Sequence, residues 1–184
     1  VGQPPQAFPS ITLGVFELTP LEVAQAYTLF LNEGSVRPLK SIARIETATT
    51  NLRPKDAPLK RVARADTTFL VTNMLRSVLN EGTGAGARAA GFALDAAGKS
   101  GTTNDQRDAW FVGFTPELLT VVWVGFEDNM PVSLTGSQAA LPIWTDFMKA
   151  ATAGRASTPF EVPEGITFAE IDRDTGKLAL PGCP

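Results

Sequence analysis

The chain has 184 residues, 43% of them apolar, which is enough for one domain with a substantial core, and its longest apolar run is far below the roughly 20 residues that span a bilayer. Lys and Arg total 16 against 19 Asp and Glu, a net charge of −3, and the basic residues are scattered, so no nucleic-acid footprint is visible and no nucleic-acid partner is expected. The sequence has no His, and Cys183 is its one cysteine, which excludes Ser-His-Asp triads, Cys-His dyads, an internal disulfide and nearly all zinc sites.

The first predicted element is a helix from Pro20 to about Asn32. Val1–Ser10, rich in Pro and Gln, reads as a loop, and the first 15 residues lack the basic start and apolar core of a signal peptide. Thr19 supplies an N-cap, Pro20 the first helical position and Glu22 a capping-box acid. Apolar positions cover most of the circumference, so we expect a largely buried helix that ends near Gly34.

The next segment predicts a strand, a turn and a second helix. Ser41–Thr50 alternates weakly, as a strand does, and Asn51–Leu59 carries two prolines and charged residues, which indicates an exposed turn. Asp66 can cap a helix over Thr67–Leu79, which Glu81-Gly82 ends. The apolar stripe of this helix is Phe69, Leu70, Met74, Leu75 and Val78.

A hairpin and a closing helix follow. Ala109–Phe114 and Leu119–Phe126, separated by Thr115-Pro116-Glu117, predict two antiparallel strands, with the segment around Lys99 as a third. Their tryptophans, Trp110 and Trp123, are expected in the core rather than in a groove. A helix that starts near Pro142 should pack on this sheet through the apolar residues Ile143, Trp144, Phe147 and Met148.

After Ala153 the sequence returns to proline and glycine, with Asp174-Thr175-Gly176 as a tight turn between short strands. We therefore expect residues 1–153 to form the main domain and residues 154–184 a C-terminal extension of short strands or loop.

The motif with chemical content is Gly98-Lys99-Ser100-Gly101-Thr102-Thr103. A phosphate-binding P-loop would need a glycine five residues before Gly98, where Ala93 stands, and would open a helix rather than lead into a strand. Lys-Ser-Gly on a strand is the third signature of serine acyl-transferases that react with penicillin. The tripeptide alone is also common by chance, and a lysine before a strand is usually only a solvent-exposed charge. No Ser has Lys three positions on, and none has Asn or Asp two positions on, so the nucleophile is missing from this sequence.

Long stretches around the motif carry a family resemblance. They are Leu13–Tyr27, Glu81–Gly84, Gly98–Asp105, Asp108–Phe114 and Trp123–Asn129. With them the chain resembles the C-terminal part of the transpeptidase domain of class A penicillin-binding proteins, the bifunctional peptidoglycan synthases. The resemblance implies an α+β fold of the penicillin-binding and serine β-lactamase type, present here as a partial domain with a central antiparallel sheet flanked by helices.

The resemblance also implies roles for the motif residues. The backbone N–H of Thr102 would meet the oxyanion, and the Lys99 charge with the hydroxyls of Ser100 and Thr102 would hold the substrate carboxylate. Lys99 would also stabilise the absent Ser-x-Asn serine and help to move its proton. Gly101 would let the substrate backbone lie along the strand. Thr103 is a further candidate for substrate binding, although a regular strand points its hydroxyl to the opposite face from that of Thr102, which favours a structural role.

Segments beside the motif are expected to support it. Gly82–Gly86 should be a mobile loop at the cleft rather than a phosphate cradle, and Asn104, Asp105 and Arg107 should lie in a solvated turn. No metal or cofactor is expected.

The implied function is cross-linking of peptidoglycan stem peptides that end in D-Ala-D-Ala, with β-lactam antibiotics acylating the same serine. The implied partners are these peptides and the N-terminal half of the domain, and the implied location is the outer face of a bacterial inner membrane, held there only through an N-terminal anchor absent from this sequence. Two alternatives remain: a D,D-carboxypeptidase or β-lactamase-like hydrolase, and a non-catalytic scaffold with a degenerate transpeptidase fold.

Overall fold

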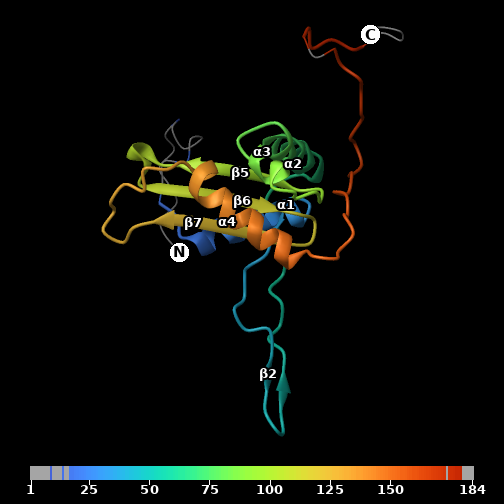
Figure 1. The fold of residues 1–184 in the computed structure, drawn as a ribbon. Coiled ribbons are helices and arrows are strands. Elements are labelled where there is room, and N and C mark those ends of the chain that lie inside the picture. The colour runs from blue at the N-terminus through green and yellow to red at the C-terminus, as the bar shows by residue number, and fades with distance from the viewer. Residues whose placement is uncertain (1–8, 10–13, 15–16, 173, 180–184) are drawn as a thin grey trace.

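A computed structural model describes residues 9, 14, 17–172 and 174–179. At its centre lies a three-stranded antiparallel sheet in the order β5 (Ala97–Thr102), β6 (Asp108–Phe114) and β7 (Leu119–Gly125) (Figure 1). The predicted hairpin, the third strand and the α+β class are confirmed. The helices are α1 (Pro20–Leu31), α2 (Ala65–Asn80), α3 (Ala85–Ala89) and α4 (Gly136–Ala151).

Helices cover both faces of this sheet. Side chains alternate along β6, so Phe111 and Phe114 lie on opposite faces. Phe111 packs against Trp144 of α4 with ring centroids 5.1 Å apart, and Phe114 stacks on Phe30 of α1 at 5.4 Å. The sheet is therefore sandwiched between α1 and α4, while α2 and α3 lie beside β5 (Figure 1).

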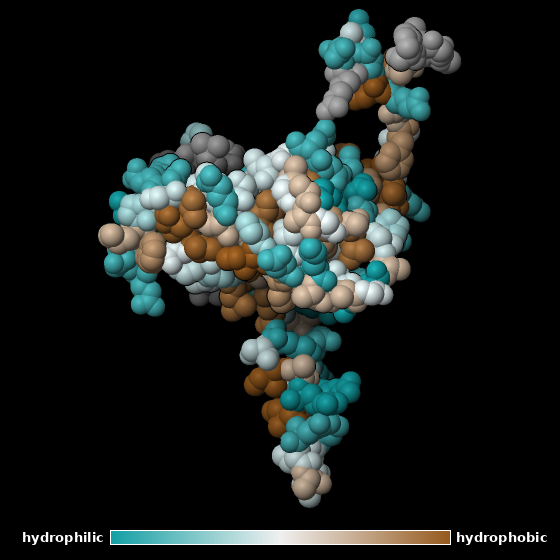
Figure 2. All heavy atoms as spheres, viewed as in Figure 1, coloured by the Kyte–Doolittle hydropathy of each residue, from teal (hydrophilic) through white to brown (hydrophobic). Residues whose placement is uncertain are grey.

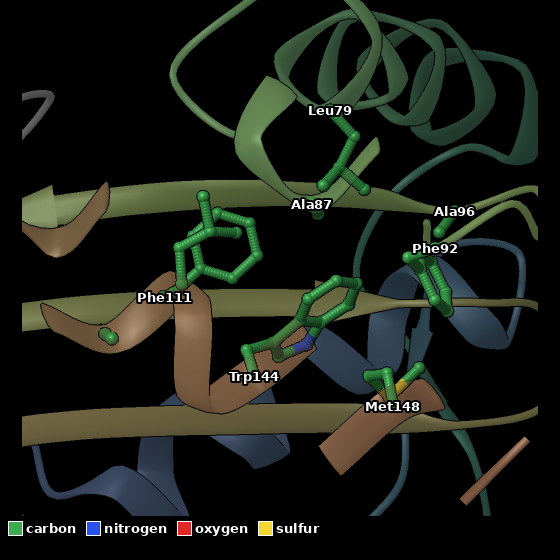
Figure 3. Packing of buried hydrophobic residues seen from close by; sticks show 9 residues of the cluster. Leu79, Ala87, Phe92, Ala96, Phe111, Trp144 and Met148 are labelled. Atoms are coloured by element: carbon green, nitrogen blue, oxygen red, sulfur yellow. The ribbon is translucent and has the colours of Figure 1, made fainter. Parts of the chain in front are cut away.

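The hydrophobic core lies between the sheet and α2, α3 and α4 (Figure 3). Trp144 is fully buried there, and its indole Nε1 donates to the Gly113 carbonyl oxygen at 3.1 Å, so the ring is held without an unpaired polar atom. The buried members of the cluster are Leu79, Ala87, Phe92, Ala96, Phe111, Ala140, Leu141, Trp144 and Met148.

The predicted cap and bounds of α1 are confirmed, but its predicted burial is wrong. The Thr19 hydroxyl accepts from the Glu22 N–H, and the Glu22 carboxylate accepts from the Thr19 N–H. Only Thr28 of this helix is buried, and Leu21 is 67% exposed, because a single side of α1 faces the sheet and its neighbours. Apolar residues around most of the circumference of α1 therefore do not imply that other elements cover every side of the helix.

The prediction for α2 is correct in place and wrong in detail. The N-cap is Arg64, so Asp66 lies inside the first turn, and Leu70 and Met74 of the predicted apolar stripe are 52% and 69% exposed. The buried face instead includes Thr72, whose hydroxyl donates to the Thr68 carbonyl oxygen four residues earlier. That bond satisfies the hydroxyl within the helix, so threonine can occupy the buried side.

Helix α4 begins six residues earlier than Pro142, which lies within it. Thr135 forms a capping box with Gln138 and starts the helix at Gly136. Trp144 and Met148 are buried as predicted. Ile143 and Phe147, also predicted for the face on the sheet, are about half exposed, at 53% and 51%.

A long hairpin projects from the body of the molecule below the sheet (Figure 1). The predicted strand over Ser41–Thr50 is reduced to two residues, and the predicted turn over Asn51–Leu59 opens with a strand. Apolar side chains gather on part of the hairpin surface (Figure 2), including the exposed Ile42 and Leu52. Its pairs are β1 (Ser35–Val36) with β4 (Lys60–Arg61), and β2 (Ile45–Glu46) with β3 (Asn51–Leu52).

The segment after α4 leaves the body of the molecule (Figure 1), and its described residues, 152–172 and 174–179, form no further helix or sheet. The predicted turn at Asp174–Gly176 is present, closed by a single bridge between Ile171 and Leu178 rather than by two strands. Cys183 and most of the predicted loop Val1–Ser10 lie outside the described residues. Within the described ranges, no helix has the length and apolar character needed to cross a membrane.

Candidate functional site

Motif residues Gly98–Thr102 lie on β5, at the edge of the sheet, and Thr103 follows its last residue. Gly98 is buried, whereas Lys99 and Thr102 are exposed and Ser100 is half-buried. Ser100 pairs with Phe111 and Thr102 with Ala109, so both hydroxyls lie on the α4 face, while Lys99 and Gly101 belong to the opposite face. The chain thus brings an ammonium group and two hydroxyls to one open strand edge.

The backbone of β5 also directs hydrogen-bond donors to this edge. The Thr103 N–H donates to the Asp108 carbonyl oxygen at 3.1 Å, across to β6. Because backbone N–H groups alternate in direction along a strand of an antiparallel pair, those of Thr102 and Ser100 point away from β6. A ligand strand laid along β5 would meet both.

The side chain of Lys99 reaches the same edge. Its Nζ donates to the carbonyl oxygen of Ser100 at 2.6 Å, and that carbonyl also points away from β6. Among the described residues no carboxylate lies within ion-pairing distance of Nζ. The positive charge is therefore available to an anionic ligand.

The Ser100 hydroxyl is paired with a residue of the glycine-rich segment. Its Oγ lies 2.8 Å from Oγ of Thr83. The prediction of a loop over Gly82–Gly86 is wrong in its second half, because α3 begins at Ala85. Two glycines flank Thr83 and bond to α2: the Gly82 N–H donates to the Ser77 carbonyl oxygen, and the Gly84 N–H donates to that of Val78.

The Thr102 hydroxyl meets the start of α4. Its Oγ accepts a hydrogen bond from the Gly136 N–H at 3.1 Å. A Cβ at Gly136 would lie 2.5 Å from the Gly101 carbonyl oxygen and still closer to that of Trp110, so only glycine permits this approach. Since the Gly136 N–H occupies one acceptor site of Thr102, the hydroxyl proton remains free to donate.

Thr103 lies differently from the other motif residues. Its hydroxyl donates to Oδ2 of Asp108 at 3.1 Å and accepts from the Asp108 N–H at 2.8 Å. The Trp123 Nε1 donates to the other carboxylate oxygen of Asp108 at 2.9 Å. In this structure Thr103 closes the turn between β5 and β6.

The tryptophan pair is not part of the core. Trp110 and Trp123 lie side by side on the face of Lys99, with ring centroids 6.2 Å apart. Trp123 is 41% exposed, so its predicted core position is wrong, and Trp110 is only half-buried. They lie at the end of the strands remote from Phe114, which is the end that α1 covers.

The turn after the motif is exposed, as predicted. Asn104–Gln106 forms a short 3₁₀ helix in which Asp105 and Gln106 take left-handed φ values of 59° and 52°. Arg107 ties this turn to the segment after β7 by donating from Nη1 to the Asn129 carbonyl oxygen at 2.7 Å.

Two supporting residues, Thr83 and Gly136, were not identified from the sequence. The sequence does carry a signal for each residue. Thr83 stands between two glycines, and Thr135 and Gln138 have the spacing of a capping box, which makes Gly136 the first residue of a helix. The described residues contain no group of three or more Asp, Glu, Cys or His side chains that could hold a metal ion.

Comparison with known proteins gives a consistent family. Residues 5–149 match the family described as penicillin binding protein transpeptidase domain. The chain is 37% identical over 176 residues to penicillin-binding protein 1B of Vibrio cholerae, covering 94% of this chain and 22% of that protein. It is 38% identical over 177 residues to penicillin-binding protein 1A of Aquifex aeolicus, covering 95% and 24%.

A solved structure is similar over the same region. The crystal structure of penicillin-binding protein 1A from Haemophilus influenzae matches with a TM-score of 0.85 and 27% identity, covering 96% of this chain and 32% of that one. The chain therefore spans less than a third of the length of these relatives.

Proposed function

The chain belongs to the penicillin-binding protein transpeptidase family, as part of a class A transpeptidase domain, and we propose that it forms the carboxylate- and oxyanion-binding side of a serine D,D-transpeptidase site. The observation that carries the proposal is the edge of β5. Lys99 Nζ, the hydroxyls of Ser100 and Thr102, and the Thr102 N–H all lie along it.

The oxyanion role belongs to the backbone of Thr102. Attack of a serine hydroxyl on the penultimate D-Ala carbonyl places negative charge on that oxygen, and an N–H fixed in the sheet can stabilise the charge without reorganising. Removing one such donor costs about 3 kcal/mol of transition-state stabilisation in other acyl-transfer enzymes. Collapse of the intermediate expels the terminal D-Ala and leaves an acyl-enzyme, which an amine of a second stem peptide attacks.

The carboxylate role belongs to side chains. A D-Ala-D-Ala peptide and a penicillin both end in a free carboxylate, which can accept from the Lys99 ammonium and from the two hydroxyls. Gly101 carries no side chain, so the ligand backbone can lie close against β5. We assign Thr103 to the turn rather than to the ligand, because its hydroxyl is bonded to Asp108.

This sequence contains no Ser-x-x-Lys and no Ser-x-Asn. In the proposed site the nucleophilic serine therefore comes from a segment outside this sequence. In the complete site, Lys99 would also face the Ser-x-Asn serine and favour transfer of its proton. The complete protein would cross-link peptidoglycan stem peptides at the outer face of a bacterial inner membrane and would be acylated by β-lactams.

A chromogenic cephalosporin tests the reaction class on the protein that carries this chain together with its serine-bearing segment. A transpeptidase opens about one molecule per site and stays acylated, which denaturing mass spectrometry detects. Continuous turnover would identify a hydrolase, and no reaction would identify a scaffold. Either of these results contradicts the proposal.

A pair of lysine variants tests the site. Lys99 and Lys149 both donate from Nζ to a backbone carbonyl, at 2.6 and 2.7 Å, but only Lys99 lies on β5. Loss of a charge-assisted hydrogen bond predicts that Lys99→Gln slows acylation about 10- to 100-fold. Lys149→Gln should acylate at the unchanged rate, and equal rates for the two variants would refute the assignment of Lys99.

A further inference from the structure

Thr83 is the one residue outside β5 whose side-chain hydroxyl contacts the hydroxyl of Ser100 in the described part of the chain. The two oxygens are 2.8 Å apart, although the residues are 17 positions apart in sequence. Thr83 lies in the connection between α2 and α3, two helices that lie beside β5 (Figure 1). The contact therefore links the glycine-rich turn to the carboxylate-binding side chains.

The backbone around Thr83 is held firmly in place. A Cβ at Gly82 would lie 2.9 Å from Cα of Val78, and a Cβ at Gly84 would lie 3.1 Å from Cδ2 of Leu79. Leu79 is completely buried in the core. The turn thus packs directly on the last turn of α2, which fixes the position of Thr83 relative to the sheet.

From this geometry we infer that Thr83 is a positioning residue for carboxylate recognition, an inference that rests on the proposed function. A carboxylate only accepts hydrogen bonds, so Ser100 must donate its single proton to a bound carboxylate. The remaining bond between Ser100 and Thr83 then has one direction: the Thr83 hydroxyl donates and Ser100 Oγ accepts. Thr83 orients the Ser100 proton toward the ligand and strengthens its donation, because hydrogen bonds in a chain polarise one another.

Thr102 has an equivalent arrangement with a backbone donor. The Gly136 N–H donates to Thr102 Oγ, which leaves the Thr102 proton for the ligand. In the bound state both hydroxyls would therefore accept a hydrogen bond from a group that does not touch the ligand: Ser100 from the Thr83 hydroxyl, and Thr102 from the Gly136 N–H. Only the contact with Thr83 can be removed without altering backbone, which makes it the testable one.

The experiment compares acylation of the catalytically complete protein by a penicillin and by its neutral methyl ester. Thr83→Val keeps the shape and removes the hydroxyl. We expect the second-order acylation rate to fall about five- to tenfold with the free acid, the usual effect of one lost hydrogen bond, and to stay unchanged with the ester. Thr83→Ser, which keeps a hydroxyl, should restore the acid-to-ester ratio.

A second background separates positioning from a general loss of structure. In Ser100→Ala protein, Thr83→Val should have no further effect, because the proton that it orients is absent. An equal loss with acid and ester, or an equal loss in both backgrounds, would overturn the inference while leaving the proposed function intact. Wild-type protein that neither compound acylates would overturn the proposed function, and this inference with it.

Discussion

Replacing Gly136 by alanine should push the start of α4 away from β5. The new Cβ would lie 2.5 Å from the Gly101 carbonyl oxygen, against 3.4–4 Å for an ordinary van der Waals contact, and backbone oxygens of a paired sheet cannot rotate aside. The helix must therefore shift by roughly 1 Å. Overpacking of this size costs about 1–3 kcal/mol, and loss of the hydrogen bond to Thr102 adds about 1 kcal/mol.

The assay is chemical denaturation followed by far-UV circular dichroism, with Gly86→Ala as the matched control. A Cβ at Gly86, within α3, would meet only Cδ2 of Leu141 at 3.5 Å, an ordinary contact, so this variant should be neutral or more stable by up to about 1 kcal/mol. We expect Gly136→Ala to lose about 2–4 kcal/mol. If the two variants unfold at the same denaturant concentration, the steric reasoning at the β5–α4 contact is wrong.

Three further predictions follow from local contacts. Tyr27 is the chain's single tyrosine, and burial raises its pKa above the usual 10.0, so tyrosinate absorbance should appear at higher pH in folded than in denaturant-unfolded protein. The contribution of this pKa shift to the free energy of unfolding is complete below pH 10 and is lost as pH rises through the pKa of the folded state. Hydrogen bonds from Thr19 lower the pKa of Glu22 below 4.5, so the stability that the capping box gives to α1 is present above pH 4.5 and is lost as pH falls through the pKa of the folded state. Glu22→Gln should remove this acid-dependent loss of helical circular dichroism. Arg76→Met should destabilise the fold by about 1–2 kcal/mol, because it removes the 2.8 Å ion pair with Asp95, whose side chain is only 18% exposed. A thermal melt measures this loss, and an unchanged melting temperature would show that water replaces the guanidinium without cost.

The elements that sequence reasoning located best are those whose signal is local. The runs of aromatic and β-branched residues over Ala109–Phe114 and Leu119–Phe126, joined by a proline turn, indicate a hairpin from local sequence alone. The Thr19-Pro20 start of α1 is equally local, because the cap and the first turn are satisfied within four residues. These strands and that helix start were predicted to within a residue or two.

Burial was predicted less well, because it depends on what each helix faces. Apolar residues such as Met74 and Phe147 mark a stripe on a helix, but the stripe does not show which part of it the sheet covers. Thr68 and Thr72 lie on the buried side of α2, since each hydroxyl bonds the carbonyl four residues before it. No hydropathy scale places them there.

The candidate site shows the same division between local and non-local information. The residues that would touch the ligand form one contiguous motif on β5 and are visible in the sequence. The groups behind them come from distant segments, and in both cases glycine makes the approach possible: Gly136 lets α4 reach Thr102, and the glycines beside Thr83 let its turn pack on α2. A strand edge by itself leaves side chains free to rotate, so in the proposed site these two supports would fix the direction of the hydroxyls. Pre-organisation of this kind lowers the entropic cost of binding a carboxylate. In the proposed site the glycines outside the motif hold these supports in place, so substitutions there should alter recognition without changing any group that touches the ligand.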